Sequence, residues 1–216
     1  MCPDAPGVST TAYNNGMRIL VINGSYRPGG ITDQTLEAMR RTLADDGHEV
    51  IEAPLRDLDI RFCLNCRECT QQLGAEPGRC VQKDDMANLI GQIEACDGCI
   101  LASPTNCGAV TALFKRFMER LVVYGYWPWD APAPKPRRPG RRMPTVLVSS
   151  SGAPGLMGRW LFETTRQLRR AAKMFGGQVR GTCFTGLAAT APDLQLSARQ
   201  RRKAGRIARR LASPRR

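Results

Sequence analysis

A loop rich in glycine and hydroxyl groups follows the first apolar run of the chain, residues 18–23. The loop, residues 24–31, contains three glycines, Ser25 and Arg27, and Thr32 comes directly after it. A helix that starts here offers free N–H groups and a partial positive charge, the hydroxyls and the arginine add donors, and glycines let the backbone approach closely. These residue types predict a phosphate site, and the alternative is an ordinary strand-to-helix turn.

Three sequence patterns that this loop lacks narrow the class of phosphate-containing ligand that it could bind. It has neither the lysine of the Gly-x4-Gly-Lys-Ser/Thr pattern nor the Gly-x-Gly-x-x-Gly pattern, and it contains no cysteine. The first two absences disfavour a nucleoside triphosphate loop and a dinucleotide fingerprint. The third excludes a Cys-x5-Arg phosphatase.

A second group of chemically active residues is a run of cysteines. Cys63, Cys66 and Cys69 recur at every third position, and Cys80 follows after ten further residues. This spacing matches a cluster-binding run with Cys80 as the fourth thiolate. A zinc site is an alternative, although zinc sites with four thiolates usually carry paired knuckles, and free thiols without a metal are the third interpretation. The chain has nine cysteines, an odd number that favours metal or redox chemistry over a disulfide framework.

Apolar runs and helical periodicities alternate along the chain and would position these residues. The expected strands are residues 18–23, 48–52, 98–102, 145–148 and 178–184. The expected helices are one capped by Thr32, one from Asp84, one over residues 110–122, one over residues 156–175 and a last one that includes residues 204–211. Residues 54–83 and 124–143 are expected to be irregular.

Five strands that alternate with helices predict an α/β fold in three layers. Its doubly wound, five-stranded parallel sheet would have the order 2-1-3-4-5. In that order, ligands bind where strands 1 and 3 part at their carboxyl ends, a crevice built here by residues 24–32 and 103–109. The phosphate loop therefore falls where this fold takes a ligand.

Composition limits the remaining possibilities. We expect residues 1–16 to be a disordered leader, residues 17–196 to be one domain and residues 197–216 to be a basic helix and tail. No apolar run is long enough for a membrane span and no signal peptide is recognisable, which predicts a cytoplasmic protein. The net charge of +13 comes from residues 134–142 and 197–216. A solvated surface is favoured there over a nucleic-acid-binding module, because no aromatic residues accompany the tail arginines.

Several short motifs together resemble a known family. They are Gly24-Ser25-x-Arg27-x-x-Gly30-x-Thr32, Asp84-Asp85-Met86, Ser103-Pro104 and Lys115-x3-Glu119-Arg120. The set is similar to landmarks of the NADPH-dependent FMN reductase family, within the flavodoxin-like proteins, from about Arg18 to Phe184. The resemblance implies an oxidoreductase with FMN as cofactor and NAD(P)H as co-substrate. Such an enzyme passes a hydride through FMN to a quinone-like or other small acceptor, and a homodimer or tetramer is expected.

The resemblance also implies which residues contact the flavin. Those expected at the FMN phosphate are Ser25, Arg27, Ile31 and Thr32, and those expected at the isoalloxazine ring are Pro104, Thr105, Asn106, Cys107 and Gly108. Ser150 and Gly152 are a third candidate contact, with a polar turn as the alternative. The family often has an aromatic side chain where this chain has Asn106-Cys107. No catalytic residue is assigned, because the hydride step requires no protein acid or base.

The cysteine run resembles a branch of this family, the iron-sulfur flavoproteins, which pass electrons between FMN and a [4Fe–4S] cluster. The gap before Cys80 is longer than the compact motif of that branch. This resemblance implies an alternative function, a flavin and iron-sulfur electron-transfer protein without its own NAD(P)H activity. Its metal ligands would be Cys63, Cys66, Cys69 and Cys80.

An aromatic and arginine-rich segment follows the helix over residues 110–122. Tyr124, Tyr126, Trp127 and Trp129 would either line the substrate face of the flavin, including across a dimer, or pack in the core or between subunits. The arginines in residues 137–142 would either attract the NADPH phosphate or be solvated.

Overall fold

The computed structural model describes residues 16–155 and 161–213. The expected leader, except for Gly16, and the first five residues of the helix expected over 156–175 lie outside the described residues.

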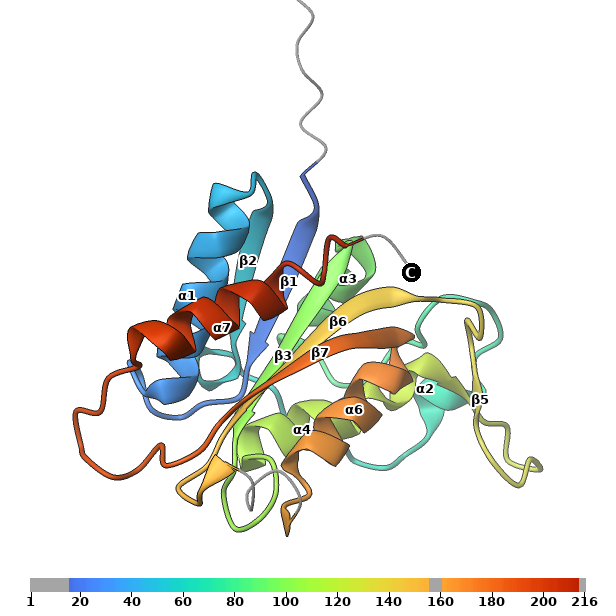
Figure 1. Cartoon of the computed structure of the whole chain (residues 1–216). Coiled ribbons are helices and arrows are strands. Elements are labelled where there is room, and N and C mark those ends of the chain that lie inside the picture. The colour runs from blue at the N-terminus through green and yellow to red at the C-terminus, as the bar shows by residue number, and fades with distance from the viewer. Residues whose placement is uncertain (1–15, 156–160, 214–216) are drawn as a thin grey trace, which may run out of the picture.

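A five-stranded parallel sheet forms the centre of the molecule (Figure 1). Its strands are β1 (Arg18–Asn23), β2 (Glu49–Pro54), β3 (Gly98–Pro104), β6 (Met143–Ser150) and β7 (Gly177–Thr185). Their order, β2-β1-β3-β6-β7, is the predicted order 2-1-3-4-5, and every neighbouring pair is parallel. Short apolar runs joined by helical crossovers leave few other topologies, so the sheet order was predictable.

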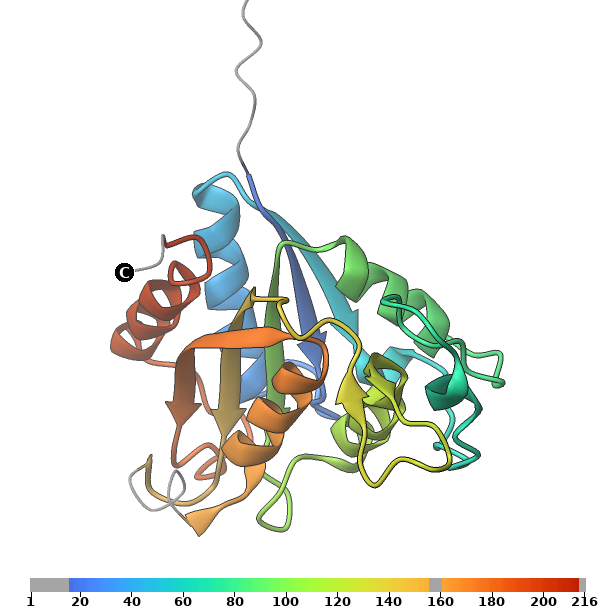
Figure 2. The ribbon, with the colours of Figure 1, turned by 90° about the vertical axis from the view of Figure 1, so that its right-hand side faces the viewer.

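Helices cover both faces of this sheet (Figures 1 and 2). One face carries α1 (Ile31–Asp45) and α7 (Ala198–Ala208), and the other carries α3 (Met86–Ala95), α4 (Ala112–Arg120) and α6 (Thr164–Met174). Successive residues of a strand point to opposite faces, so Ile19 and Val21 pack toward α1 and α7, whereas Leu20 and Ile22 pack toward the other layer. The predicted three-layer, flavodoxin-like architecture is confirmed.

The first helix starts differently from the prediction. Its N-cap is Gly30, no side chain of the described part caps it, and Thr32 is already its second residue. The assignment of Thr32 as the N-cap was therefore wrong. The Thr32 hydroxyl bonds instead to that of Ser150 at the end of β6, a long-range contact that the local sequence does not reveal.

The two segments expected to be irregular contain short elements. Residues 54–83 include the 3₁₀ turn η1 (Leu55–Asp57) and the helix α2 (Glu68–Gln71). The later segment begins in the 3₁₀ turn η2 (Leu121–Tyr124), and its two-residue strands β4 (Gly125–Tyr126) and β5 (Lys135–Pro136) pair antiparallel. Expecting no element there was wrong, because two-residue strands carry no detectable alternation.

The last helix, α7, packs its apolar face against α1. Ser197 and Gln200 form a capping box at its start, and Ala204, Ile207 and Ala208 are buried. A Cβ at Gly205 would stand 2.6 Å from the Thr42 hydroxyl oxygen, so glycine permits the close approach of the two helices. The division between residues 196 and 197 stays a prediction. In the described part of the chain, we find no helix whose length and apolar character would suit a membrane crossing.

Candidate functional site

Three loops meet beyond the carboxyl ends of β1, β3 and β6, at the lower left of Figure 1. The Gly24 N–H donates to the carbonyl of Ala102 at 2.8 Å, and the Thr111 hydroxyl donates to the Gly24 carbonyl at 2.6 Å. The Thr105 N–H donates to the Ser150 carbonyl at 2.7 Å. These bonds hold the loops in fixed relative positions, as a preformed binding site requires.

The phosphate loop, residues 24–32, leads into an open helix N-terminus. Because α1 has no side-chain cap, the N–H groups of its first turn face the loop without an intrahelical partner. The Ser25 hydroxyl is buried and donates to the Arg27 carbonyl at 3.3 Å. The Arg27 side chain is exposed and pairs with no acid among the described residues. This arrangement concentrates donors and positive charge at one point.

Three residues that the sequence patterns did not indicate support this loop through hydrogen bonds and an ion pair: Asn23, Asp33 and Arg56. Asp33 accepts hydrogen bonds from the Asn23 amide at 2.7 Å and from the Gly29 N–H at 3.0 Å. Arg56 pairs with Asp33 at 3.3 Å and donates to the Ser25 carbonyl at 3.2 Å. Asp33 lies in the first turn of α1, and its negative charge there is offset by the positive charge of Arg56. The Asn-x9-Asp spacing was visible in the sequence, but nothing indicated that Arg56 joins it.

The structure brings Thr32 and Ser150 together. Their hydroxyl oxygens lie 2.9 Å apart, and both residues are buried. The phosphate loop and the end of β6 therefore share one hydroxyl pair. Gly152, the other residue assigned to this third contact, is exposed two positions farther on.

The second loop, residues 104–108, is a tight turn. Asn106 and Ala109 exchange backbone hydrogen bonds at 2.9 and 3.0 Å, and the two residues between them have φ angles of 48° (Cys107) and 78° (Gly108). Two positive φ values are typical of a type I′ turn. The N–H groups of Cys107 and Gly108 have no partner among the described residues, and the Gly108 carbonyl accepts from the Glu163 N–H at 2.8 Å. The tip of the turn thus presents free donors at the site.

The four cysteines of the run line a single cavity. The chain bends sharply between them, with φ angles of 53° at Asn65 and 61° at Arg67. The Asn65 N–H donates to the Cys63 sulfur at 3.4 Å. Within residues 16–155 and 161–213, no three His, Cys, Asp or Glu side chains stand in a group that could hold a metal ion. The backbone brings the four cysteines to one place, and the choice of ligands stays a prediction.

A buried ion pair borders this cavity. Arg120 binds the Asp84 carboxylate at 2.5 and 3.1 Å, and the two side chains are 2% and 0% exposed. The other contacts of the Arg120 guanidinium are the Arg61 carbonyl at 2.8 Å and the Cys80 sulfur at 3.5 Å. Burial alone would raise the pKa of Asp84, but the hydrogen bonds from Arg120 hold it below its usual value.

The thiols affect one another electrostatically. Burial, followed by the charges of Cys80, Cys63 and Cys66, raises the pKa of Cys69 to about 11. Negative charges on neighbouring thiolates oppose ionisation of Cys69, which is consistent with the four residues lining one cavity. By contrast, Cys96 and Cys99 are buried in the core.

The aromatic cluster packs on the cysteine segment of the same chain. The Arg67 guanidinium lies 4.0 Å from the ring centre of Trp127 and 4.3 Å from that of Trp129. The backbone N–H of Trp127 donates to the Thr70 carbonyl at 2.9 Å, and Tyr124 is buried. These contacts favour the packing interpretation for Tyr124 and Trp127. Trp129 is 65% exposed.

The arginines of residues 137–142 are neither all solvated nor beside the phosphate loop. Arg137 donates to the carbonyls of Cys69, Gly74 and Val123, and Arg138 and Arg141 bind Glu94. The segment leads into the amino end of β6, the opposite end of the strand from the three loops. It therefore braces the cysteine segment, and the expected role toward an NADPH phosphate has no support from this placement.

Comparisons with known proteins agree with this architecture. A family model described as NADPH-dependent FMN reductase matches residues 17–185. An iron-sulfur flavoprotein of Archaeoglobus fulgidus is 36% identical over 112 residues, which is 52% of this chain and 49% of that protein. An iron-sulfur flavoprotein of Methanocaldococcus jannaschii is 31% identical over 104 residues, or 48% and 51% of the two chains. The chain spans about half the length of the curated relatives that it matches.

Solved structures share the fold. An NAD(P)H:quinone oxidoreductase from Methanothermobacter marburgensis has a TM-score of 0.65 at 17% identity, over 93% of this chain and 98% of that one. An azoreductase from Bacillus anthracis has a TM-score of 0.62 at 12% identity, over 89% and 98%. At such identities the likeness shows the fold alone.

Proposed function

The chain belongs to the NADPH-dependent FMN reductase family, and we propose that it is an FMN-dependent oxidoreductase in which NAD(P)H reduces a quinone-like or other small acceptor. Family membership supports flavin chemistry, and the fold shared with a solved NAD(P)H:quinone oxidoreductase is consistent with it. Because the chain spans about half of its curated relatives, the activity, co-substrate and acceptor are all proposals.

The observation that carries this proposal is the uncapped start of α1. A helix N-terminus without a cap leaves donors that a phosphate satisfies, and its dipole favours the phosphate charge. Ser25 and Thr32 add hydroxyls at this point, and the exposed Arg27 side chain is free to add a charge-assisted bond. The donor set therefore fits an FMN phosphate, with Ile31 contributing its backbone N–H.

The other two loops complete the proposed site. The turn at Cys107 and Gly108 would direct its free N–H groups to the polar edge of the flavin ring, and Thr105 is tied to Ser150 beneath it. An aromatic stacking partner is missing at Asn106-Cys107, so backbone donors rather than stacking would orient the ring.

When bound, FMN supplies hydride and electron transfer, and the protein contributes position and electrostatics. The positive charge of Arg56 offsets the negative charge of the Asp33 carboxylate, to which the Asn23 amide also donates, and this pairing reduces the repulsion between Asp33 and the phosphate. No acid or base of this chain is needed to move a proton in the hydride step, and we assign no catalytic residue.

Two measurements test this function. FMN binding is followed by flavin fluorescence, and NADH and NADPH oxidation are then followed with quinone, nitro and azo acceptors. We expect stoichiometric FMN and turnover with at least one acceptor. Bound FMN without turnover on any acceptor would exclude the reductase while leaving the flavin site intact.

A second candidate function is electron transfer through FMN and an iron-sulfur cluster. The observation that favours it is the cavity lined by Cys63, Cys66, Cys69 and Cys80. The Asn65 N–H and the Arg120 guanidinium already donate to sulfur there, and such hydrogen bonds tune clusters in proteins. The curated relatives carry the name iron-sulfur flavoprotein. In this candidate the four thiolates would hold a [4Fe–4S] cluster.

Iron and sulfide analysis of anaerobically purified protein tests this candidate. About four of each per chain would support the cluster. Zinc without sulfide would replace it with a structural metal, and metal-free protein that reconstitution leaves unchanged would reject both. A homodimer or tetramer stays a prediction that analytical ultracentrifugation can check.

A further inference from the structure

A cavity of about 320 Å³ lies at the end of the sheet away from the three loops. Its wall is built by residues 136–142, the end of α6 and the start of β7. Met143 of β6 is in register with Gly177 of β7, so the cavity lies beside the amino ends of both strands. Because β6 has eight residues, its two ends are separated by roughly 25 Å. The cavity is therefore distinct from the proposed flavin site.

The side chains that line this cavity carry one sign of charge. None of its lining residues is acidic, and five are cationic: Arg137, Arg138, Arg141, Arg142 and Lys173. Residues 134–142 are also one of the two stretches that supply the positive excess of the whole chain. A concave surface with one sign of charge concentrates ions of the opposite sign.

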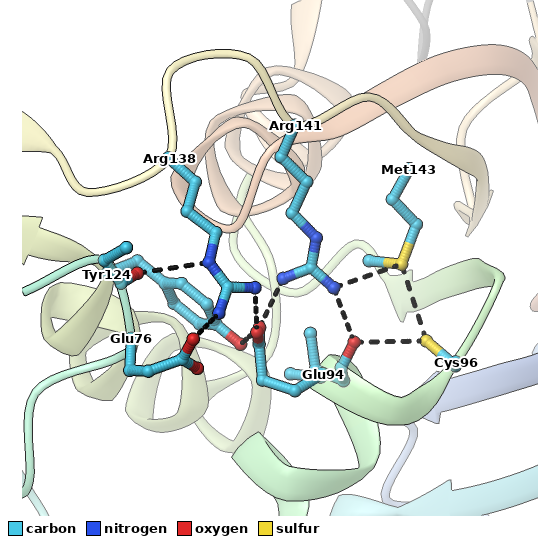
Figure 3. Close-up of polar contacts among 9 residues, drawn as sticks. Glu76, Glu94, Cys96, Tyr124, Arg138, Arg141 and Met143 are labelled. Atoms are coloured by element: carbon cyan, nitrogen blue, oxygen red, sulfur yellow. Dashed lines mark hydrogen bonds and ion pairs between the residues drawn. The ribbon is translucent and has the colours of Figure 1, made fainter.

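Two of the five cations, Arg138 and Arg141, pair with carboxylates that are not part of the cavity lining, as Figure 3 shows. Glu94 accepts from Arg138 at 2.6 Å and also from Arg141, and Glu76 accepts from Arg138. The Tyr124 hydroxyl donates to the same Glu94 carboxylate at 3.0 Å. This network holds two guanidinium groups in place and makes one wall of the cavity rigid.

The other three cations have no carboxylate partner within the described residues. Arg137 donates only to backbone carbonyls, and Arg142 donates to the carbonyls of Pro139 and Arg141. Arg142 and Lys173 are exposed. Five cations face two carboxylates, which leaves an excess of three positive charges at the cavity. That excess suits a doubly charged anion such as a phosphate monoester.

The remaining lining is largely apolar. Pro77, Pro136, Pro139, Met174 and Phe175 contribute to the walls and the floor. The volume lies at the lower end of the range for small-molecule sites, which combine an apolar lining with a few placed polar groups. An inorganic ion would leave these apolar walls unused, whereas a flat ring attached to a phosphate would cover them.

We propose that this cavity binds a small organic phosphate with a flat apolar body, of the mononucleotide type, with Arg142 and Lys173 holding the phosphate. The site goes beyond the proposed function, because none of its residues is assigned to FMN or to the cysteine run. The flat body of the ligand would contact Pro139 and Met174. The guanidinium groups of Arg138 and Arg141, which Glu94 holds in place, would lie at the edge of the ligand.

The test is calorimetric titration of the full chain, loaded with one equivalent of FMN, with adenosine monophosphate and separately with inorganic phosphate. The variant is Arg142→Gln/Lys173→Gln. The matched control is Arg199→Gln/Arg206→Gln, which removes the same charge from exposed positions on α7.

We expect wild type and control to bind the mononucleotide equally and inorganic phosphate at least tenfold more weakly. The Arg142→Gln/Lys173→Gln variant should lose at least tenfold in mononucleotide affinity, and added salt should weaken binding by the wild type. Equal affinity of the variant and the control, or no heat at millimolar mononucleotide, would overturn the proposal. Both variants leave the three loops of the proposed flavin site unchanged, so the difference in affinity between them does not depend on flavin binding.

Discussion

The hydroxyl oxygens of Thr32 and Ser150 lie 2.9 Å apart, although 118 positions separate the two residues in the sequence. Thr32 belongs to the first turn of α1, and Ser150 ends β6. The strand between β1 and β6 in the sheet is β3, so this pair spans its end and joins two of the three loops. The contact makes the phosphate loop depend on a residue far along the chain.

Replacing Thr32 by valine should weaken FMN binding. Thr32→Val keeps the side-chain shape but removes a hydroxyl and leaves the buried Ser150 hydroxyl without its partner. An unsatisfied buried hydroxyl costs about 1–3 kcal/mol of free energy. We expect the dissociation constant of FMN to rise about tenfold, which corresponds to about 1.4 kcal/mol. The measurement is fluorescence titration with FMN.

Thr35→Val is the matched control for that change. Thr35 is also buried in α1, but its hydroxyl donates to the Ile31 carbonyl of the same helix. Its FMN affinity should stay close to wild type. Equal losses in both variants would show that Thr32 acts only through the stability of the helix.

Arg27→Gln should weaken FMN binding but not riboflavin binding, because riboflavin lacks the phosphate. Arg27 is exposed, so its replacement should change the free energy of unfolding by no more than about 0.5 kcal/mol. Arg41→Gln removes an exposed charge farther along α1 and serves as the control. An Arg27→Gln variant with unchanged FMN affinity would remove Arg27 from the site.

Breaking the buried pair of Arg120 and Asp84 should be strongly destabilising. Arg120→Met leaves the Asp84 carboxylate buried without its cation, and such changes cost about 3–5 kcal/mol. Lys115→Met breaks the exposed pair with Glu119 and should cost about 0–1 kcal/mol. Urea denaturation measures both values. Similar losses for the two variants would contradict the burial seen here.

The cost of Arg120→Met should also depend on pH in a defined direction. The pKa of Asp84 is lowered in the folded protein, so its charge stabilises the fold at pH values above the ordinary carboxyl pKa of about 3.9. That contribution is lost as the pH falls through the depressed value in the folded state. The difference in unfolding free energy between wild type and Arg120→Met should therefore shrink below about pH 4. A difference in unfolding free energy between the two proteins that stays constant from pH 7 to pH 3 would contradict this prediction.

Alkylation of the metal-free protein should discriminate between two cysteines of the run. Cys66 is exposed, whereas burial and the neighbouring thiolates raise the pKa of Cys69 to about 11. At pH 8 roughly one Cys69 side chain in a thousand would be the reactive thiolate. Mass spectrometry after iodoacetamide treatment should find Cys66 modified well before Cys69, with the gap closing as the pH approaches 11. Equal rates at pH 8 would contradict the burial of Cys69.

The sheet and its ligand crevice followed from local patterns. Runs such as Ile19–Ile22 and Val146–Val148 are short, apolar and separated by amphipathic helices, and right-handed crossovers then leave only a few possible orders of the strands. The position of the phosphate loop followed from the same reasoning, because it depends on strand order and not on any single contact.

Other parts of the site depend on contacts between distant residues, which a local pattern does not encode. Arg56 supports Asp33, and Arg137 braces the Cys69 backbone, but neither arginine differs in its sequence context from the many solvated arginines of this chain. Thr32 looked like a cap because hydroxyl residues favour that position, yet Gly30 takes it and frees the hydroxyl for Ser150.

The most direct test of the flavin site is a titration of anaerobically purified protein with FMN, followed by its visible absorbance spectrum after gel filtration. We predict that one FMN per chain stays with the protein and shows the bands of a bound flavin. Protein that elutes colourless after incubation with excess FMN would contradict the assignment of the three loops as a flavin site.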